Sequence, residues 1–138
     1  MQKLFDEVDS RLFDQTLSLK GLAAQFGYSE KYILQLFKKK YGETFLQYLQ
    51  RRRIENARTL LAETDLSVAE IARRCGYTGD QSFRRNFVQS TSLTPGEYRS
   101  KTELKKTTKY RRIERLNLSI IPAVQFLNGG NFFVLYKF

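Results

Sequence analysis

Residues 17–28 read LSLKGLAAQFGY, and residues 66–77 read LSVAEIARRCGY. The two stretches lie 49 residues apart and carry apolar residues at the same positions before a Gly-Tyr pair. Further along, the match continues at an offset of 50, as between Phe37 and Phe87. The one-residue change falls just after the Gly-Tyr pair, where a turn can absorb it. Each copy predicts a helix, a tight turn and a second helix, which is a shape that the major groove of DNA accepts.

Apolar residues at helical spacing predict the helices around the first copy. Residues 2–14 combine an apolar face with an acidic one, which is typical of a short amphipathic helix. Residues 19–26 repeat the same period, and Gly27 supplies the backbone freedom to leave that helix. Ser29 is a suitable N-cap for a further helix to about Tyr41. The apolar face of the helix in residues 2–14 consists of Leu4, Phe5, Val8, Leu12 and Phe13.

Capping patterns predict where the remaining helices begin. Thr44 and Gln47 form a capping-box pattern at the start of the longest helical stretch, which runs to about Ala62. At 1.5 Å per residue that stretch is a rod of about 27 Å between the two copies. Capping-box patterns recur in residues 67–70 and 94–97. No strand is expected in either copy, so the predicted fold is all-α, with two helix-turn-helix subdomains joined by a long central helix.

These elements predict two segments with different roles. Residues 1–100 form a tandem helix-turn-helix domain, and residues 101–138 form a C-terminal extension of unknown role. The extension begins with a dense basic stretch that either continues the last helix or forms a solvated arm, and residues 128–131 suggest a hairpin turn. The parts of the domain are a first unit (about 1–43), a linker helix (about 44–63) and a second unit (about 64–100).

The charge of the chain indicates an anionic partner. Among 138 residues, 24 Lys and Arg outnumber 14 Asp and Glu, which gives a formal net charge of +10. Residues 15–100 and 101–138 carry +6 each, whereas residues 1–14 carry −2. This balance does not choose among DNA, RNA and an anionic membrane.

The chain offers little for catalysis or metal binding. It has no His and a single Cys, Cys75, so an intrachain disulfide is excluded and the usual zinc ligand sets are missing. Without a Gly-rich phosphate loop or a nucleophile-base set, an enzyme is the weakest hypothesis, and we expect no cofactor, no metal and no small-molecule site. Cys75 is interpreted as a small core residue. No signal peptide or membrane-spanning run is present, so a soluble, cytoplasmic protein is expected.

Outward positions on the second helix of each copy are the candidates for reading DNA bases. In such a unit the first helix braces the second, whose exposed N-terminal face meets the base edges. Arg and Lys can reach guanine, Gln can pair with adenine, and Leu34 can offer an apolar contact to a thymine methyl. For Arg84 and Arg85, the alternative is a salt bridge to Asp80 or Glu97. The base-reading candidates are Lys31, Leu34, Gln35, Gln81, Arg84 and Arg85.

Other polar and basic residues are candidates for contacts to the DNA backbone, which set affinity and register but not sequence. The candidates are Ser29, Lys38, Lys39, Thr44, Arg52, Thr78, Ser82 and Thr94. Further basic residues interpreted as phosphate neutralisers, or else as ordinary solvated surface, are Lys40, Arg51, Arg53, Arg73 and Arg74.

A longer string of residues surrounds the two copies. It reads YLQRRRIENARTLL at 48–61, FRRNF at 83–87 and TPGEYR at 94–99. With the repeat, it resembles the C-terminal DNA-binding domain of the AraC/XylS family of bacterial transcription regulators over residues 17–100. Ser92 stands where that family usually has Gly, so we expect the turn before the last helix to be shaped differently.

The resemblance implies two helix-turn-helix subdomains on a long helix, with the family's base-reading positions falling on the six candidates named above. It also implies a transcription regulator, typically an activator that contacts RNA polymerase, with double-stranded DNA as its partner. The rod of about 27 Å is of the order of the ~34 Å repeat of B-DNA, so one chain would reach two successive major-groove segments of modestly bent DNA.

Two rival functions stay open, as does the extent of the regulator. A helical protein-interaction module predicts apolar residues at the six candidate positions, where only Leu34 is apolar. A membrane-surface binder would act through the basic and apolar residues 101–138. Residues 1–16 leave no room for the effector domain of most family members, so the chain is either a short stand-alone member or the C-terminal piece of a larger regulator.

Overall fold

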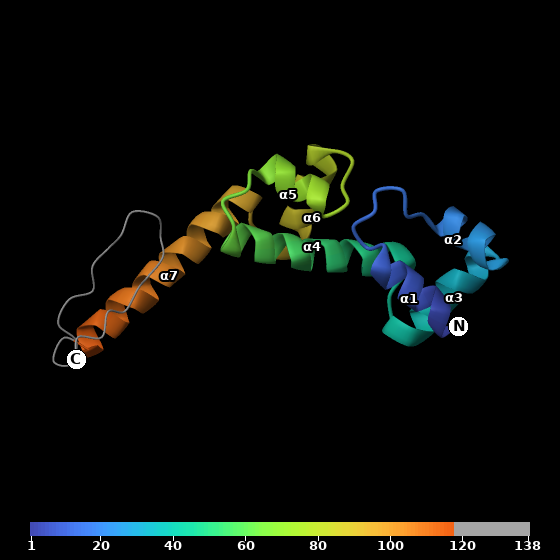
Figure 1. The fold of residues 1–138 in the computed structure, drawn as a ribbon, viewed down its shortest axis with the longest axis horizontal. Coiled ribbons are helices and arrows are strands. Elements are labelled where there is room, and N and C mark those ends of the chain that lie inside the picture. Colours follow the sequence, from blue (N-terminus) through green and yellow to red (C-terminus); the bar gives the residue numbers. More distant parts are fainter. Residues whose placement is uncertain (118–138) are drawn as a thin grey trace, which may run out of the picture. The chain divides into compact units, whose positions relative to one another are not determined.

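The computed structural model describes residues 1–117, with side chains through residue 109. The chain divides into two parts, Met1–Lys101 and Thr102–Phe138. Within the described residues, all regular structure is helical, as the sequence predicts (Figure 1). The helices are α1 (Gln2–Ser10), α2 (Leu19–Phe26), α3 (Glu30–Tyr41), α4 (Phe45–Glu63), α5 (Val68–Arg74), α6 (Asp80–Thr91) and α7 (Pro95–Asn117).

The first unit, made of α1 to α3 and the start of α4, has an aromatic core around Phe37. This ring is fully buried, and its centroid lies 5.3 Å from those of Phe5 and Phe45 and 5.4 Å from that of Tyr48. All three contacts are edge-to-face, the arrangement that the charge distribution of aromatic rings favours. The helix α1 therefore closes the core of the first unit.

The second unit, made of α5, α6 and the start of α7, packs on the other part of α4. Ile71 of α5 and Phe83 and Phe87 of α6 are fully buried there. Cys75 is also fully buried, which confirms its interpretation as a core residue, and burial raises the pKa of its thiol. The thiol is therefore protonated and poorly reactive at neutral pH.

The long helix α4 contributes to both cores. Figure 1 shows it running from α1–α3 to α5 and α6. Its buried residues divide between the first core (Phe45, Tyr48, Leu49) and the second (Ile54, Ala57, Leu61). The two units thus share one rod of 19 residues, or about 28 Å.

Two of the three predicted capping boxes form. Thr44 and Gln47 exchange both hydrogen bonds at the start of α4, and Thr94 and Glu97 do so at the start of α7. At α5, Ser67 accepts from the backbone N–H of Glu70 at 3.1 Å, but the Glu70 carboxylate pairs with Arg73 and Arg74 instead of reaching back. The prediction there is wrong because two arginines one turn later compete for the carboxylate.

The first helix is shorter than predicted, because a turn replaces its last residues. The Asp14 carboxylate accepts from the backbone N–H of Thr16 at 2.7 Å and from its hydroxyl at 2.6 Å, while the Arg11 guanidinium donates to it at 2.8 Å. These contacts lower the pKa of Asp14 to about 2. Leu12 stays buried, but Phe13, which the sequence places on the same apolar face, is 43% exposed.

The turn before α7 has the same shape as its counterpart in the first unit. Ser92 adopts the left-handed conformation with φ 61°, as Gly42 does with φ 74°. The expectation of a different turn is therefore wrong, because Ser92 takes up the conformation despite its Cβ. Left-handed backbone costs a residue with a Cβ about 1 kcal/mol.

The basic stretch that follows is helical rather than a solvated arm. The helix α7 continues through it to Asn117, and the charged side chains of residues 101–109 are exposed. The hairpin predicted around residues 128–131 lies outside the described residues. Within those residues, a helix with both the length and the apolar character needed to cross a membrane is not found.

Candidate nucleic-acid interface

The helices α3 and α6 occupy equivalent places, each after a tight turn that ends a shorter helix. The first turn contains Gly27 with φ 67°, and the second contains Gly76 with φ 87°. Ser29 caps α3 by accepting from the backbone N–H of Tyr32 at 3.1 Å, whereas α6 begins at Gly79 without a side-chain cap. Both helices thus start where the repeat predicts.

All six base-reading candidates are exposed on these two helices. Ile33 and Leu36 point into the first core, and Phe83 and Phe87 into the second, which turns the neighbouring positions outward. Leu34 is 38% exposed. The outward faces carry Lys31, Leu34 and Gln35 on α3, and Gln81, Arg84 and Arg85 on α6.

On α6, the two arginines are not equivalent. Arg84 Nε donates to Asp80 Oδ2 at 2.7 Å, so the alternative salt bridge does form for this residue. Both side chains are about half exposed, 50% and 46%, and such surface pairs contribute little, so Arg84 can exchange Asp80 for another acceptor. Arg85 is exposed and makes no hydrogen bond or ion pair with any other described residue. Arg85 is therefore the more available donor.

The candidates for backbone contacts fall into two groups. Ser29, Thr44 and Thr94 are N-caps whose hydroxyl oxygens accept from backbone N–H groups, and Lys38 donates to the carbonyl oxygen of Gly42 at 2.8 Å. The others are exposed, apart from the half-buried Arg52. Arg52 contacts the Asp9 carboxylate at 3.5 Å, and the exposed members are Lys39, Thr78 and Ser82.

Several of the presumed phosphate neutralisers already have partners. Arg51 pairs with Glu43 at 2.6 Å and with Glu55 at 3.1 Å. The Lys40 ammonium lies 3.8 Å from the centre of the Phe5 ring. Arg73 and Arg74 pair with the carboxylate on α5 described above. These cations remain near the surface, but each would have to give up an internal contact to bind a phosphate.

Arg53 does not fit the role of phosphate neutraliser. Its Nε donates to the carbonyl oxygen of Leu12 at 2.7 Å, and its Nη2 to that of Asp14 at 2.9 Å. The guanidinium is half-buried, and burial lowers its pKa, although an arginine stays charged at neutral pH. The interpretation from sequence is wrong here, since the partners lie 39 and 41 residues away and no local pattern marks them.

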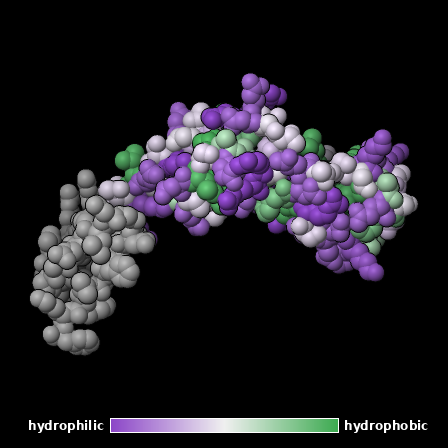
Figure 2. Space-filling view, turned by 45° about the horizontal axis from the view of Figure 1, so that its top comes forward, coloured by the Kyte–Doolittle hydropathy of each residue, from purple (hydrophilic) through white to green (hydrophobic). Residues whose placement is uncertain are grey.

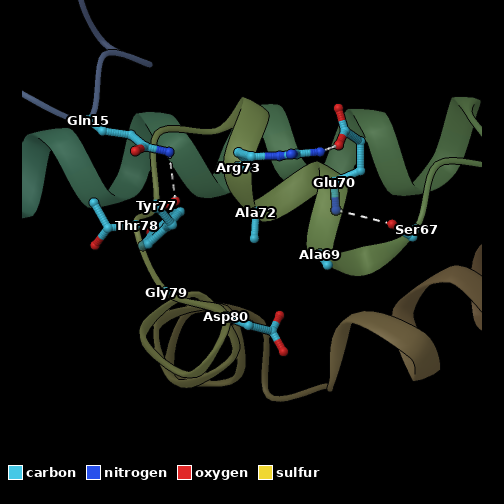
Figure 3. Close-up of a pocket in the computed structure, with 10 residues that line it drawn as sticks. All are labelled: Gln15, Ser67, Ala69, Glu70, Ala72, Arg73, Tyr77, Thr78, Gly79 and Asp80. Carbon is cyan, nitrogen blue, oxygen red and sulfur yellow. Dashed lines mark hydrogen bonds and ion pairs between the residues drawn. The ribbon is translucent and has the colours of Figure 1, made fainter.

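A hollow of about 450 Å³ lies beside the second turn. Figure 3 shows Ser67, Glu70 and Arg73 on its α5 side and Thr78 and Asp80 at the start of α6. Its lining mixes acidic and basic groups. Among the described residues there is no group of three or more potential metal ligands.

The exposed surface is hydrophilic for the most part. Figure 2 shows polar and charged residues over most of the coloured face, with hydrophobic residues in small separate patches.

Comparison with known proteins gives a family and a fold. A family model described as a helix-turn-helix domain matches residues 22–101. The uncharacterised HTH-type transcriptional regulator YijO of Escherichia coli is 36% identical over 104 residues, which are 75% of this chain and 36% of the relative. The transcriptional activator RhaR of Mannheimia succiniciproducens is 36% identical over 101 residues, which are 73% of this chain and 36% of the relative.

Solved structures with a similar fold also come from transcription regulators. The DNA-binding domain of AdpA, solved in complex with a target DNA, has a TM-score of 0.71 and 25% identity, covering 77% of this chain and 95% of that one. The C-terminal domain of the response regulator yesN of Fusobacterium nucleatum has a TM-score of 0.67 and 30% identity, covering 71% and 95%. The chain spans only about a third of the length of YijO and RhaR.

Proposed function

This chain belongs to the AraC-type helix-turn-helix family of DNA-binding transcription regulators, and we propose from that premise that it reads one specific site on double-stranded DNA with α3 and α6 together. The family and the relatives are regulators and not enzymes. The observation that carries the proposal is the pair of exposed, polar helix faces held on one shared rod.

The length of α4 supports reading by a single chain. The helix is about 28 Å long. Together with the width of the flanking units, this length is comparable to the ~34 Å that separates successive major-groove segments on one side of B-DNA. The fit is imperfect for straight DNA, and a modest bend would make up the difference at a cost of a few kcal/mol. Because the two faces carry different side chains, the site would be asymmetric.

Side chains with unpaired hydrogen-bond donors favour α6 as the helix that contributes more to base recognition. Arg85 is exposed and unpaired among the described residues, and Gln81 lies one turn before it. An arginine bound to guanine through two hydrogen bonds is the commonest specific contact in the major groove. On α3, Lys31 and Gln35 can make polar base contacts, and Leu34 an apolar one.

Regulation of transcription, and activation through RNA polymerase, form the further part of the proposal. One relative, RhaR, is named a transcriptional activator. Members of the AraC/XylS family, which the sequence resembles, usually activate transcription. The cytoplasmic location stays a prediction. Transcription in vitro from a template carrying the selected site, with and without the protein, tests the sign of regulation.

Selection of binding sites from random DNA duplexes tests the DNA-reading proposal. We expect a motif with two conserved blocks separated by about one helical turn, bound with an affinity that falls steeply as salt rises. Recovery of no motif, or of a single block of a few base pairs, would contradict reading by both helices. Binding to anionic vesicles in the same buffer, with no preference among duplexes, would favour the membrane-surface alternative.

A further inference from the structure

The loop between α1 and α2 touches the second unit. Gln15 Nε2 donates to the carbonyl oxygen of Tyr77 at 3.1 Å (Figure 3). Tyr77 belongs to the second core, whereas Leu12 and Leu17, on either side of this loop, are buried in the first. The hydrogen bond therefore joins a loop of the first unit directly to the second unit, without passing along α4.

Arg53 lies beneath this loop and fills the space between the two units. From α4, its guanidinium donates to two carbonyl oxygens of the loop, those of Leu12 and Asp14. Its Cζ lies 5.8 Å from the centre of the Tyr77 ring in the second unit. A planar guanidinium can hold two acceptors in a fixed geometry, which a lysine ammonium cannot do.

Gly76 shows how closely the units approach at this point. A Cβ at this position would lie 2.9 Å from the backbone oxygen of Phe13 and 2.9 Å from the Arg53 guanidinium carbon. Real Cβ atoms do not come so close. At the equivalent Gly27 nothing lies within 4 Å of such an atom. The second turn is thus packed against the loop and Arg53, and the first turn is open.

We propose that Arg53, with Gln15 and the bare backbone of Gly76, forms a clasp that fixes the mutual placement of α3 and α6 and so sets the spacing of the two half-sites on DNA. Arg53 is a positioning residue and need not touch DNA. The inference that the clasp sets half-site spacing rests on the proposed function; the clasp itself does not.

The clasp lies at the point along α4 where the helix has the least support from either core. Arg53 lies between Leu49, the last α4 residue in the first core, and Ile54, the first in the second. This is where a bend of the rod would be least opposed by packing. A bend of about 10° there would shift either end of the helix by about 2–3 Å, close to one base-pair step of ~3.4 Å.

The test compares the full chain with Arg53→Met, which keeps an unbranched apolar stem and removes the donors. Duplexes carry the selected half-sites with native spacing or with one base pair inserted or deleted. For the parent chain we expect more than tenfold weaker binding when the spacing changes, because the two helices can no longer engage together. For Arg53→Met we expect a loss of less than threefold across the series, with base preferences inside each half unchanged.

Arg58→Met is the matched control. It removes the same charge from the same helix, but Arg58 contacts Tyr98 within the second unit rather than the loop. Its spacing profile should equal that of the parent chain. Gln15→Ala removes one exposed side chain and is the second test variant, which answers the question if Arg53→Met fails to fold.

A measurement without DNA separates the clasp from the proposed function. Residual dipolar couplings of backbone amides in α2–α3 and in α5–α6 should fit one alignment tensor in the parent chain and two different tensors in Arg53→Met. One shared tensor and an unchanged spacing profile in both Arg53→Met and Gln15→Ala would overturn the clasp. If the parent chain selects no DNA site, the proposed function fails, and the couplings still decide whether the clasp exists.

Discussion

The two Gly-Tyr turns share this residue pair and a left-handed glycine, yet have different surroundings. Gly27 and Gly76 are both left-handed, with φ 67° and 87°. Tyr28 is half-buried at the edge of the first core, whereas Tyr77 is 8% exposed beneath the loop that follows α1. The repeat requires glycine at both turns for its backbone conformation, and the second turn requires it also for lack of space. The same Gly-Tyr motif can therefore be required for two physical reasons, backbone conformation at both turns and lack of space at the second.

Substitution of the two glycines separates these demands and should have the largest effect. Gly27→Ala should lower the free energy of unfolding by about 1 kcal/mol, the strain of left-handed backbone. Gly76→Ala should lower it by about 3–4 kcal/mol, because overpacking against the loop adds to the same strain. Urea denaturation of both variants measures the difference. Equal losses would mean that the loop yields without cost.

The proposed base-reading faces of α3 and α6 provide the next contrast between the units. Arg85→Ala should weaken binding to the selected site by about 1–3 kcal/mol and relax base preference in one half only. Gln35→Ala should do the same in the other half, with a smaller loss. Competition binding against duplexes with single base changes measures both. If either variant weakens all sequences alike, that side chain contacts the backbone instead.

Lys39→Ala serves as the reference for backbone contacts. It should weaken all duplexes alike and reduce the slope of log affinity against log salt by about 1. Titrations at several salt concentrations give that slope. A change in base preference in this variant would instead assign Lys39 to base reading.

Substitutions at the C-terminal caps of α3 and α6 should change the stability less, and in opposite directions. Ser92→Gly should raise the free energy of unfolding by about 1 kcal/mol, because it relieves left-handed strain. Gly42→Ser should lower it by a similar amount. Thermal and urea unfolding of the two variants check the signs. Two changes of the same sign would show that one of the turns relaxes to another conformation.

The smallest expected effect concerns pH and the loop that covers the second turn. The folded-state pKa of Asp14 is lowered to about 2, from an ordinary value of 3.8, chiefly by the Thr16 hydroxyl, then by its backbone N–H and by Arg11. Its contribution to stability is thus complete above pH 3.8 and is lost as the pH falls through about 2. The chemical shift of the Asp14 carboxyl carbon should titrate near 2. A midpoint near 4 would mean that the loop turn does not hold in solution.

Much of this fold follows from local signals in the sequence. The caps at Ser29 and Thr44 and the turn at Gly27 depend on neighbours within four residues, so their patterns predict them well. The exposed positions of α3 and α6 follow from helical periodicity in the same way. These features are confirmed because nothing distant competes with them.

Features that depend on distant or competing partners were not predicted. Glu70 pairs with two arginines, and Phe13 is exposed after the Asp14 turn ends α1 early. Arg53 and Gln15 meet partners 39 to 62 residues away. A run of three arginines at 51–53 gives no sign of which one turns inward. Such roles emerge only when the two units are packed together.

The shared helix α4 limits how this architecture can be recombined. It supplies one wall to each core, three buried side chains on either side of Gln50–Arg53. A crossover inside α4 would join two half-helices selected to fit different cores, and would also mismatch the clasp. Under the proposed function, a new DNA specificity is therefore reached more readily by changing surface positions on α3 and α6 than by exchanging whole units between relatives. Chimaeric regulators built on this chain should keep α4 and the loop after α1 from a single parent.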